Sequence, residues 1–280
     1  MKKILKKCAA LFLFAIILYG CSSNIPLSST DPRIVEISQK FAANCFETAS
    51  PDINTTFIEL KDILNNEIYM GGTTVATNKG NLKDIETGYN LTSYPADSGT
   101  ASAIVVKAIP ASLKKFVIAE TWDKMMEVFA GRYTTYERTY TEGDKTAFIN
   151  DTIDTLKCSN HIIDIGQRGI SFEYINLMTF TRYKGEGLPA EGIVQECMYM
   201  PNEAVNVSGK YNARMSKLYS VITYIPIDGE NTYRVVTSWV KAGGGLFIFN
   251  ADANSGDVGQ GINDDSVGIT AFVTNPANFN

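Results

Sequence analysis

The feature that most constrains the fold is a series of four segments rich in β-branched and aromatic residues, a composition typical of strands. In chain order the segments are Gly169–Tyr183, Ile193–Met200, Leu218–Ile227 and Thr232–Val240. Asp228-Gly229 separates the last two, and this dipeptide favours a hairpin turn between strands. Strands that are adjacent in the chain and joined by short connections pair antiparallel. This part of the sequence therefore predicts an antiparallel sheet.

Helical patterns dominate the N-terminal half. Asp31-Pro32 is a typical helix start, and apolar residues recur at helical spacing from Ile34 to Phe46. Further helices are expected at 55–69, 121–131 and 144–156, and further strands at 101–109, 115–120, 246–249 and 267–273, with a polar loop at 250–265. The sequence predicts an α+β fold in which an antiparallel sheet, mainly residues 161–250, packs with a few N-terminal helices.

The composition is that of a folded chain, because 45% of the residues are hydrophobic and 20% are charged. We expect residues 31–280 to form a single α+β domain. An alternative division has a helical half at 31–157 and a β-rich half at 158–280. The formal net charge of −5 provides no basic surface for nucleic acid, so a nucleic-acid partner is not expected.

The first twenty residues have the order of a secretory signal. Four lysines, Lys2, Lys3, Lys6 and Lys7, precede an apolar run of twelve residues, Cys8–Tyr19. A helix that spans a bilayer needs about 20 apolar residues, so the run is too short to do so. A basic region followed by a short apolar region predicts a signal peptide at residues 1–20.

The end of this segment, Leu18-Tyr19-Gly20-Cys21, resembles the lipobox of bacterial lipoproteins, although Tyr19 is bulkier than the residue usual there. The resemblance implies that Cys21 is lipidated and that residues 21–30 form a tether. It implies a membrane partner reached through the lipid anchor and a location in the cell envelope. Because Ser22 rather than aspartate follows the cysteine, it also implies the periplasmic side of the outer membrane where two membranes exist.

Three further cysteines, Cys45, Cys158 and Cys197, lie in the predicted folded part. A disulfide is allowed outside the cytoplasm. A Cys158–Cys197 bridge is predicted, because both residues lie at or in predicted strand segments of one sheet, and this leaves Cys45 buried on a helix. The alternative is that all three thiols are reduced and buried, as free cysteines commonly are.

Candidate catalytic motifs are weak. Ser112 and Lys115 satisfy S-x-x-K and, with Tyr174-Ile175-Asn176 and Lys241-Ala242-Gly243, resemble the elements of serine β-lactamases. That resemblance implies Ser112 as nucleophile, but the motif needs a helix where this sequence predicts a strand. His161 is the only histidine, which excludes paired-histidine zinc motifs and favours a structural role. No catalytic, cofactor or metal site is predicted.

Two other patterns have competing interpretations. The segment 252–265 contains several side chains with oxygen atoms that could bind calcium, although their spacing fits a solvated acidic loop better. These residues are Asp252, Asn254, Asp257, Asp264 and Asp265. The segment RYTTYERTY could line a groove for a glycan or lipid, although tyrosines at strand spacing more often pack across a sheet. Its aromatic and basic residues are Arg132, Tyr133, Tyr136, Arg138 and Tyr140.

Taken together, the sequence predicts a membrane-anchored envelope lipoprotein that is not an enzyme and that binds or assembles with an envelope protein, glycan or lipid. Two alternatives remain open. One is a serine-type hydrolase of cell wall or lipid, with Ser112 and Lys115 as its candidates. The other is a carrier of an apolar ligand in a cavity between sheet and helix.

Overall fold

The computed structural model describes residues 36–37, 40–41, 53–66, 100–165, 169–243 and 251–279, with side chains except at 63–66, 100–102 and 251–257. The signal segment, the predicted lipidation site Cys21 and Cys45 lie outside the described residues. Within them, no helix is both long enough and apolar enough to cross a membrane.

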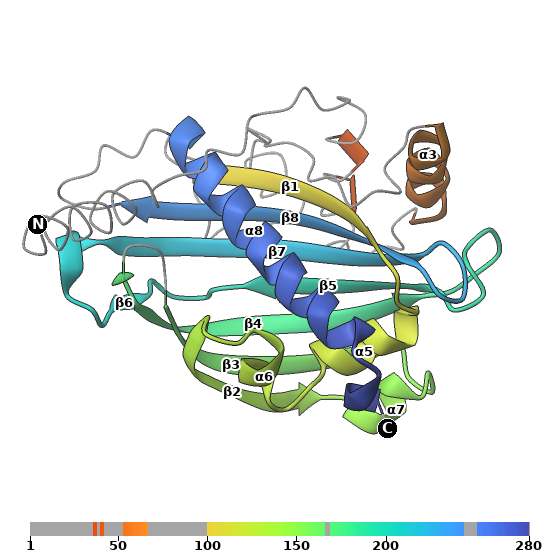
Figure 1. Ribbon diagram of the computed structural model, residues 1–280, viewed down its shortest axis with the longest axis horizontal. Coiled ribbons are helices and arrows are strands. Elements are labelled where there is room, and N and C mark those ends of the chain that lie inside the picture. The colour runs from red at the N-terminus through yellow and green to blue at the C-terminus, as the bar shows by residue number, and fades with distance from the viewer. Residues whose placement is uncertain are drawn as a thin grey trace, which may run out of the picture.

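One antiparallel sheet forms the centre of the described structure (Figure 1). Its strands are β1 (Thr100–Ile109), β2 (Tyr133–Glu142), β3 (Thr155–Asp164), β4 (Phe172–Tyr183), β5 (Ile193–Tyr199), β6 (Val205–Asn206), β7 (Arg214–Pro226) and β8 (Thr232–Gly243). They are ordered β1-β8-β7-β5-β4-β3-β2, and the short β6 pairs with β4. The first strand of the sheet thus lies beside the last one, at the edge opposite β2.

Helices lie on both faces of this sheet. They are α3 (Ile53–Asn66), α5 (Leu113–Glu120), α6 (Met125–Val128), α7 (Lys145–Ile149) and α8 (Ala251–Thr274), with 3₁₀ turns at Lys210–Asn212 and Pro276–Phe279. The long helix α8 crosses one face diagonally and packs chiefly along β1 (Figure 1), while α3 packs on the opposite face.

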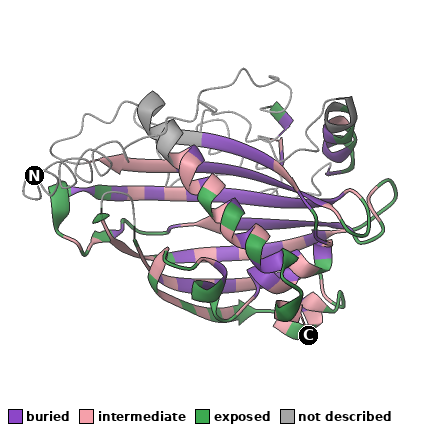
Figure 2. Ribbon diagram, viewed as in Figure 1, coloured by how far each residue is buried: buried purple, intermediate pink, exposed green. Residues whose placement is uncertain are grey.

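The central strands β5, β7 and β8 are buried on both faces along much of their length, and Glu196 and Arg234 lie buried among their apolar residues. On the α8 side, Val105, Val236, Ile222 and Phe180 join a core with α5 and α8. On the opposite side, buried residues of β1, β5, β7 and β8 pack with α3 and with Ile37 and Phe41. Figure 2 shows the resulting buried stretches along β1, β7 and β8.

The hairpin predicted at Asp228-Gly229 is confirmed. Strands β7 and β8 pair over nearly their whole length, from Arg214 with Gly243 to Pro226 with Thr232. Asp228 Oδ1 accepts hydrogen bonds from the backbone N–H groups of Glu230 and Asn231, at 2.8 and 2.7 Å. The aspartate thus holds the turn through its side chain, which is why this residue type favours turns.

The predicted fold class, α+β with an antiparallel sheet, is confirmed, but three local predictions are wrong. Residues 115–120 form helix α5 instead of a strand. Of the helix expected at 144–156, only α7 forms, and β3 begins at Thr155. The loop and strand expected between 250 and 273 are helix α8. Its glycines, asparagines and aspartates disfavour a helix locally, so packing of one face must decide its conformation.

Candidate functional site

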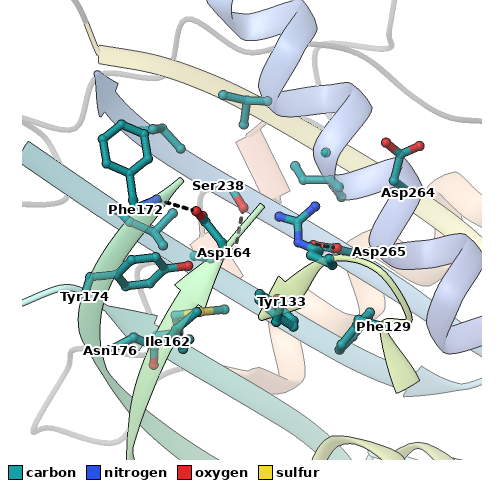
Figure 3. Close-up of a pocket in the computed structure, with 18 of the residues that line it drawn as sticks. Phe129, Tyr133, Ile162, Asp164, Phe172, Tyr174, Asn176, Ser238, Asp264 and Asp265 are labelled. Atoms are coloured by element: carbon teal, nitrogen blue, oxygen red, sulfur yellow. Dashed lines mark hydrogen bonds and ion pairs between the residues drawn. The ribbon is translucent and has the colours of Figure 1, made fainter. Parts of the chain in front are cut away.

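A cavity of about 480 Å³ lies between the α8 side of the sheet and the segment that runs from α6 into β2. Figure 3 shows its lining side chains converging from β2, β3 and β4 on one side and from β8 and α8 on the other. Helix α8 forms one wall of the cavity, and of the strands it contacts β1 most.

Apolar side chains form most of its wall. They include Met125, Phe129, Ile162, Phe172, Met178, Met198, Leu218, Ile222, Val240, Val258 and Ile262. The strand residues among them face inward because side chains alternate along a strand and aligned partners share a face. Met178 and Met198 are such partners across β4 and β5. Methionine is flexible and polarisable, so this part of the wall can adapt to the shape of a ligand.

Helix α8 contributes a narrow stripe to the cavity. Val258, Gly261, Ile262 and Asp265 follow one another at helical spacing and all line it. A Cβ atom added to Gly261 would meet no atom within 4 Å. The glycine therefore leaves space in the cavity that a side chain at this position would fill.

The predicted RYTTYERTY segment divides between the two interpretations given above. Arg132, Tyr133 and Tyr136 line the cavity, as a binding groove requires. Tyr140 instead packs against the core, and its hydroxyl donates to the Thr121 carbonyl at 2.8 Å. Arg138 is held in a hydrogen-bond network with its Nε donating to Asn160 Oδ1 at 2.7 Å.

Arg132 also connects the two walls of the cavity. Its Nε lies 3.1 Å from Asp265 Oδ1 on α8. Burial raises the pKa of Asp265 even though Arg132 acts in the opposite direction. The ion pair therefore offsets part of the free-energy cost of burying the charged Asp265 carboxylate.

A second acidic group is Asp164, the last residue of β3, which is aligned with Tyr133 of β2. Asp164 lines the cavity and accepts a hydrogen bond from the Phe172 N–H at 2.9 Å (Figure 3). Burial raises the pKa of Asp164, and the backbone hydrogen bond lowers it less. The neighbouring Tyr174 is also buried, and its pKa is raised for the same reason.

A group of buried polar residues lies where β5, β7, β8 and α5 meet. Glu120, Glu196 and Arg234 line the cavity. The Tyr224 hydroxyl donates to Glu120 Oε1, and Arg234 Nε donates to the same hydroxyl at 3.3 Å. Arg234 Nη1 also donates to Ser266 Oγ on α8 at 2.8 Å. These contacts place ionisable groups in a mostly apolar cavity, the usual pattern of a small-molecule site.

Ser112 and Lys115 are not brought to this cavity. Ser112 precedes the first residue of α5, and Lys115 Nζ lies 5.4 Å from the centre of the Phe279 ring. The cavity is lined by residues of the other two elements, Tyr174, Asn176, Ala242 and Gly243. Neither Ser112 nor Lys115 is among its lining residues. The elements that resemble a β-lactamase therefore do not form one site.

His161 lies between two glutamate side chains, Glu173 and Glu137. It lies on β3, beside the cavity residue Ile162 and so on the opposite face. Its Nε2 lies 2.8 Å from Glu173 Oε1 and its Nδ1 lies 3.4 Å from Glu137 Oε2. The hydrogen bond with Glu173, followed by that with Glu137, raises the pKa of His161.

The predicted Cys158–Cys197 disulfide does not form, and both residues are buried free thiols. The register explains this. Cys158 aligns with Met178, which aligns in turn with Met198. Cys197 is next to Met198 and therefore points to the opposite face of the sheet. Two cysteines on opposite faces of one sheet cannot bond without a large backbone movement.

The acidic residues considered for calcium lie on α8. Asp264 accepts a hydrogen bond from Gln260 Nε2 at 2.7 Å, and Asp265 pairs with Arg132. The side chains of Asp252, Asn254 and Asp257 lie outside the described residues. In the part of the chain that is described, no three His, Cys, Asp or Glu side chains are grouped to hold a metal ion.

Sequence reasoning did not identify Glu120, Glu196 or Arg234. The sequence did contain a signal for two of them, a charged residue inside a segment with strand character. Glu196 lies in Ile193–Tyr199, and Arg234 lies in Thr232–Gly243. Because charged residues are almost never fully buried unless paired, a charge in a strand buried on both faces indicates a specific environment.

Comparisons with known proteins find only distant similarity, to solved structures. No family model matches it, and no curated protein sequence matches it. A START superfamily protein from Mycobacterium smegmatis is 12% identical, with a TM-score of 0.39, over 63% of this chain and 97% of that one. A STAR-related lipid transfer protein from Xanthomonas axonopodis is 8% identical, with a TM-score of 0.40, over 65% of this chain and 97% of that one. Similarities at this level carry no argument about ligand or activity.

Proposed function

We propose that this chain is a ligand-binding protein that carries a mainly apolar small molecule in the cavity beneath α8. The observation that carries the proposal is the cavity itself, about 480 Å³ in volume and lined mostly by apolar side chains. Small-molecule sites typically have volumes of about 300–1,000 Å³ and combine apolar walls with a few placed polar groups. This supports the carrier interpretation over that of an assembly partner.

The anchor proposed from the sequence fits this function. We propose that Cys21 is lipidated and that residues 21–30 tether the binding domain to the membrane face of the cell envelope. Two or more acyl chains, each contributing about 0.8 kcal/mol per buried methylene, give a lasting attachment. A binding domain held there would have direct access to apolar molecules in the bilayer.

The cavity can be tested with purified protein. Native mass spectrometry before and after extraction with organic solvent should reveal a bound apolar molecule, and a neutral fluorescent probe such as N-phenyl-1-naphthylamine should bind the extracted protein. In the variant Gly261→Phe, which fills open space on the cavity side of α8, probe binding should be lost. Equal probe binding by both proteins would contradict the proposal.

The anchor needs a separate test. In cells given labelled palmitate, the full-length chain should incorporate the label and Cys21→Ala should not. Incorporation by the variant would show that the lipobox interpretation is wrong. The matched variant Cys158→Ala, which changes a buried thiol of the folded part, should keep the label.

A further inference from the structure

Glu196 is a buried carboxyl group whose hydrogen-bonding capacity is not met by the protein. It lies on β5 between Phe180 of β4 and Ile222 of β7, it lines the cavity, and only 1% of its surface is exposed. Its Oε2 atom has no hydrogen-bond partner among the described residues. A buried polar atom without a partner costs about 1–3 kcal/mol, so such an atom in a cavity wall indicates a group that a ligand satisfies.

The positive charges nearby do not provide that partner. Arg138 donates through Nε to Asn160, through Nη1 to the Glu120 carbonyl and through Nη2 to the Tyr136 hydroxyl. Arg234 donates to Tyr224 and Ser266. The hydrogen bonds described for both guanidinium groups therefore go to groups other than Glu196.

The surroundings also favour the neutral form of Glu196. Burial raises its pKa well above the usual range, and the nearby Glu120 carboxyl group raises it further, while Arg138 and Arg234 lower it less. A protonated carboxyl group has one O–H donor and keeps acceptor capacity on its oxygens. It is complementary to a group that can accept one hydrogen bond and donate another.

We propose that Glu196 is the polar anchor of the cavity and that its ligand is an apolar molecule ending in a neutral group that both donates and accepts, such as a hydroxyl or a primary amide. The inference rests on the proposed function, since it assigns the head group of the same ligand. A cationic amine would lie close to Arg138 and Arg234, and a carboxylate would bring a further negative charge to Glu120 and Glu196. Both would also lose their hydration in the cavity.

Head-group preference tests this proposal directly. Dodecanol, dodecanamide, dodecylamine and dodecanoate share one apolar chain, so competition with N-phenyl-1-naphthylamine at pH 7 isolates the contribution of the head. We expect the alcohol and the amide to displace the probe at roughly tenfold lower concentration than the amine or the carboxylate. Glu196→Leu should remove this preference while probe binding persists. Glu196→Gln, which keeps a donor and an acceptor, should retain it.

The controls separate the two proposals. If the four competitors act equally on the wild-type protein, or if Glu196→Leu keeps the preference, the role of Glu196 is overturned although the cavity still binds. If dodecylamine binds best and Glu196→Gln abolishes this, Glu196 acts as an anion and the neutral-ligand proposal is overturned. Failure of every probe and competitor to bind overturns the proposed function as well. The melting temperature of Glu196→Leu should equal or exceed that of wild type, because the variant removes a buried unpaired carboxyl group.

Discussion

Arg132 Nε lies 3.1 Å from Asp265 Oδ1, and this ion pair connects the segment before β2 to helix α8 across the cavity. Neither partner is fully solvated, since 37% of the arginine side chain and 24% of the aspartate side chain are exposed. Because both residues line the cavity, the pair fixes the distance between two of its walls.

The first prediction concerns this pair. Arg132→Met leaves the Asp265 carboxylate without its counter-charge, so we expect the free energy of unfolding at pH 7 to fall by roughly 1–3 kcal/mol. Burial raises the pKa of Asp265, so the folded state keeps this proton to a higher pH than the unfolded chain does, and the stability gained from protonation is lost as pH rises through the folded pKa. The deficit should therefore shrink at pH 5. Urea denaturation at both pH values measures it.

Asp265→Asn is the matched control, because it removes the titrating group. The difference in unfolding free energy between Asp265→Asn and wild type should vary with pH only through the titration of Asp265 in the wild-type protein. The double variant Arg132→Met/Asp265→Asn, compared with Asp265→Asn alone, should show a difference that does not change with pH. An Arg132→Met deficit of the same size at pH 5 and pH 7 would contradict the proposed electrostatic origin.

Gly261 is predicted to control the free volume of the cavity. Gly261→Phe should abolish probe binding while the far-ultraviolet circular dichroism spectrum remains unchanged, since the new side chain extends into open space. Val267→Phe adds the same aromatic group on the solvent side of α8, where the valine side chain is exposed. That variant should bind the probe as wild type does, and loss of binding in both would mean that α8 itself is disturbed.

Two glycines of α8 should respond differently to alanine. Gly261→Ala meets no atom, so it should raise the unfolding free energy by up to about 1 kcal/mol through helix propensity. At Gly268 the new Cβ would lie 3.1 Å from the Val128 carbonyl oxygen and from Phe129 Cδ1. Gly268→Ala should therefore show no gain or a loss. Thermal denaturation of the two variants compares them, and equal stabilisation would contradict the close approach of α6 and α8.

His161 is expected to make stability depend slightly on pH. Its hydrogen bonds with Glu173 and Glu137 raise its folded pKa, so the stabilisation is complete below its unfolded pKa of about 6.5 and is lost as pH rises through the raised value. The melting temperature of wild type minus that of His161→Gln should be largest near pH 6 and smallest near pH 8.5. The effect should be small because the pair is partly exposed. A difference that grows with pH would contradict this assignment.

Much of the sheet could be predicted because its strands carry their own signals. Strands β7 and β8 are long, apolar and joined by an aspartate-glycine turn, so local sequence and tertiary structure agree. Strand β2 had a weaker signal, the strand spacing of its tyrosines. Its side chains are threonine, tyrosine and charged residues, and they suit a strand at the edge of the sheet with one wetter face.

Helix α8 could not be predicted from local preference. Between residues 251 and 268 it contains glycines, asparagines and aspartates that favour loops in isolation. The helix is stabilised by the packing of one buried stripe, Ile262, Ser266, Ile269 and Val273. This stripe can pack only after the sheet has formed. Most of the residues that line the cavity could not be assigned for the same reason, because they come from nine separate helices and strands and no local pattern brings Glu196 near Arg234.

The position of α8 in the chain has a consequence for how the site forms. All strands of the sheet are synthesised before α8. The apolar surface around Met178, Ile222 and Val240 can therefore form before α8 is present to cover it. During synthesis or refolding this surface can be protected only by transient contacts, and exposed apolar surface promotes aggregation. A ligand present at that stage could serve as a temporary core on which α8 docks. Its presence during expression should then increase the yield of folded protein.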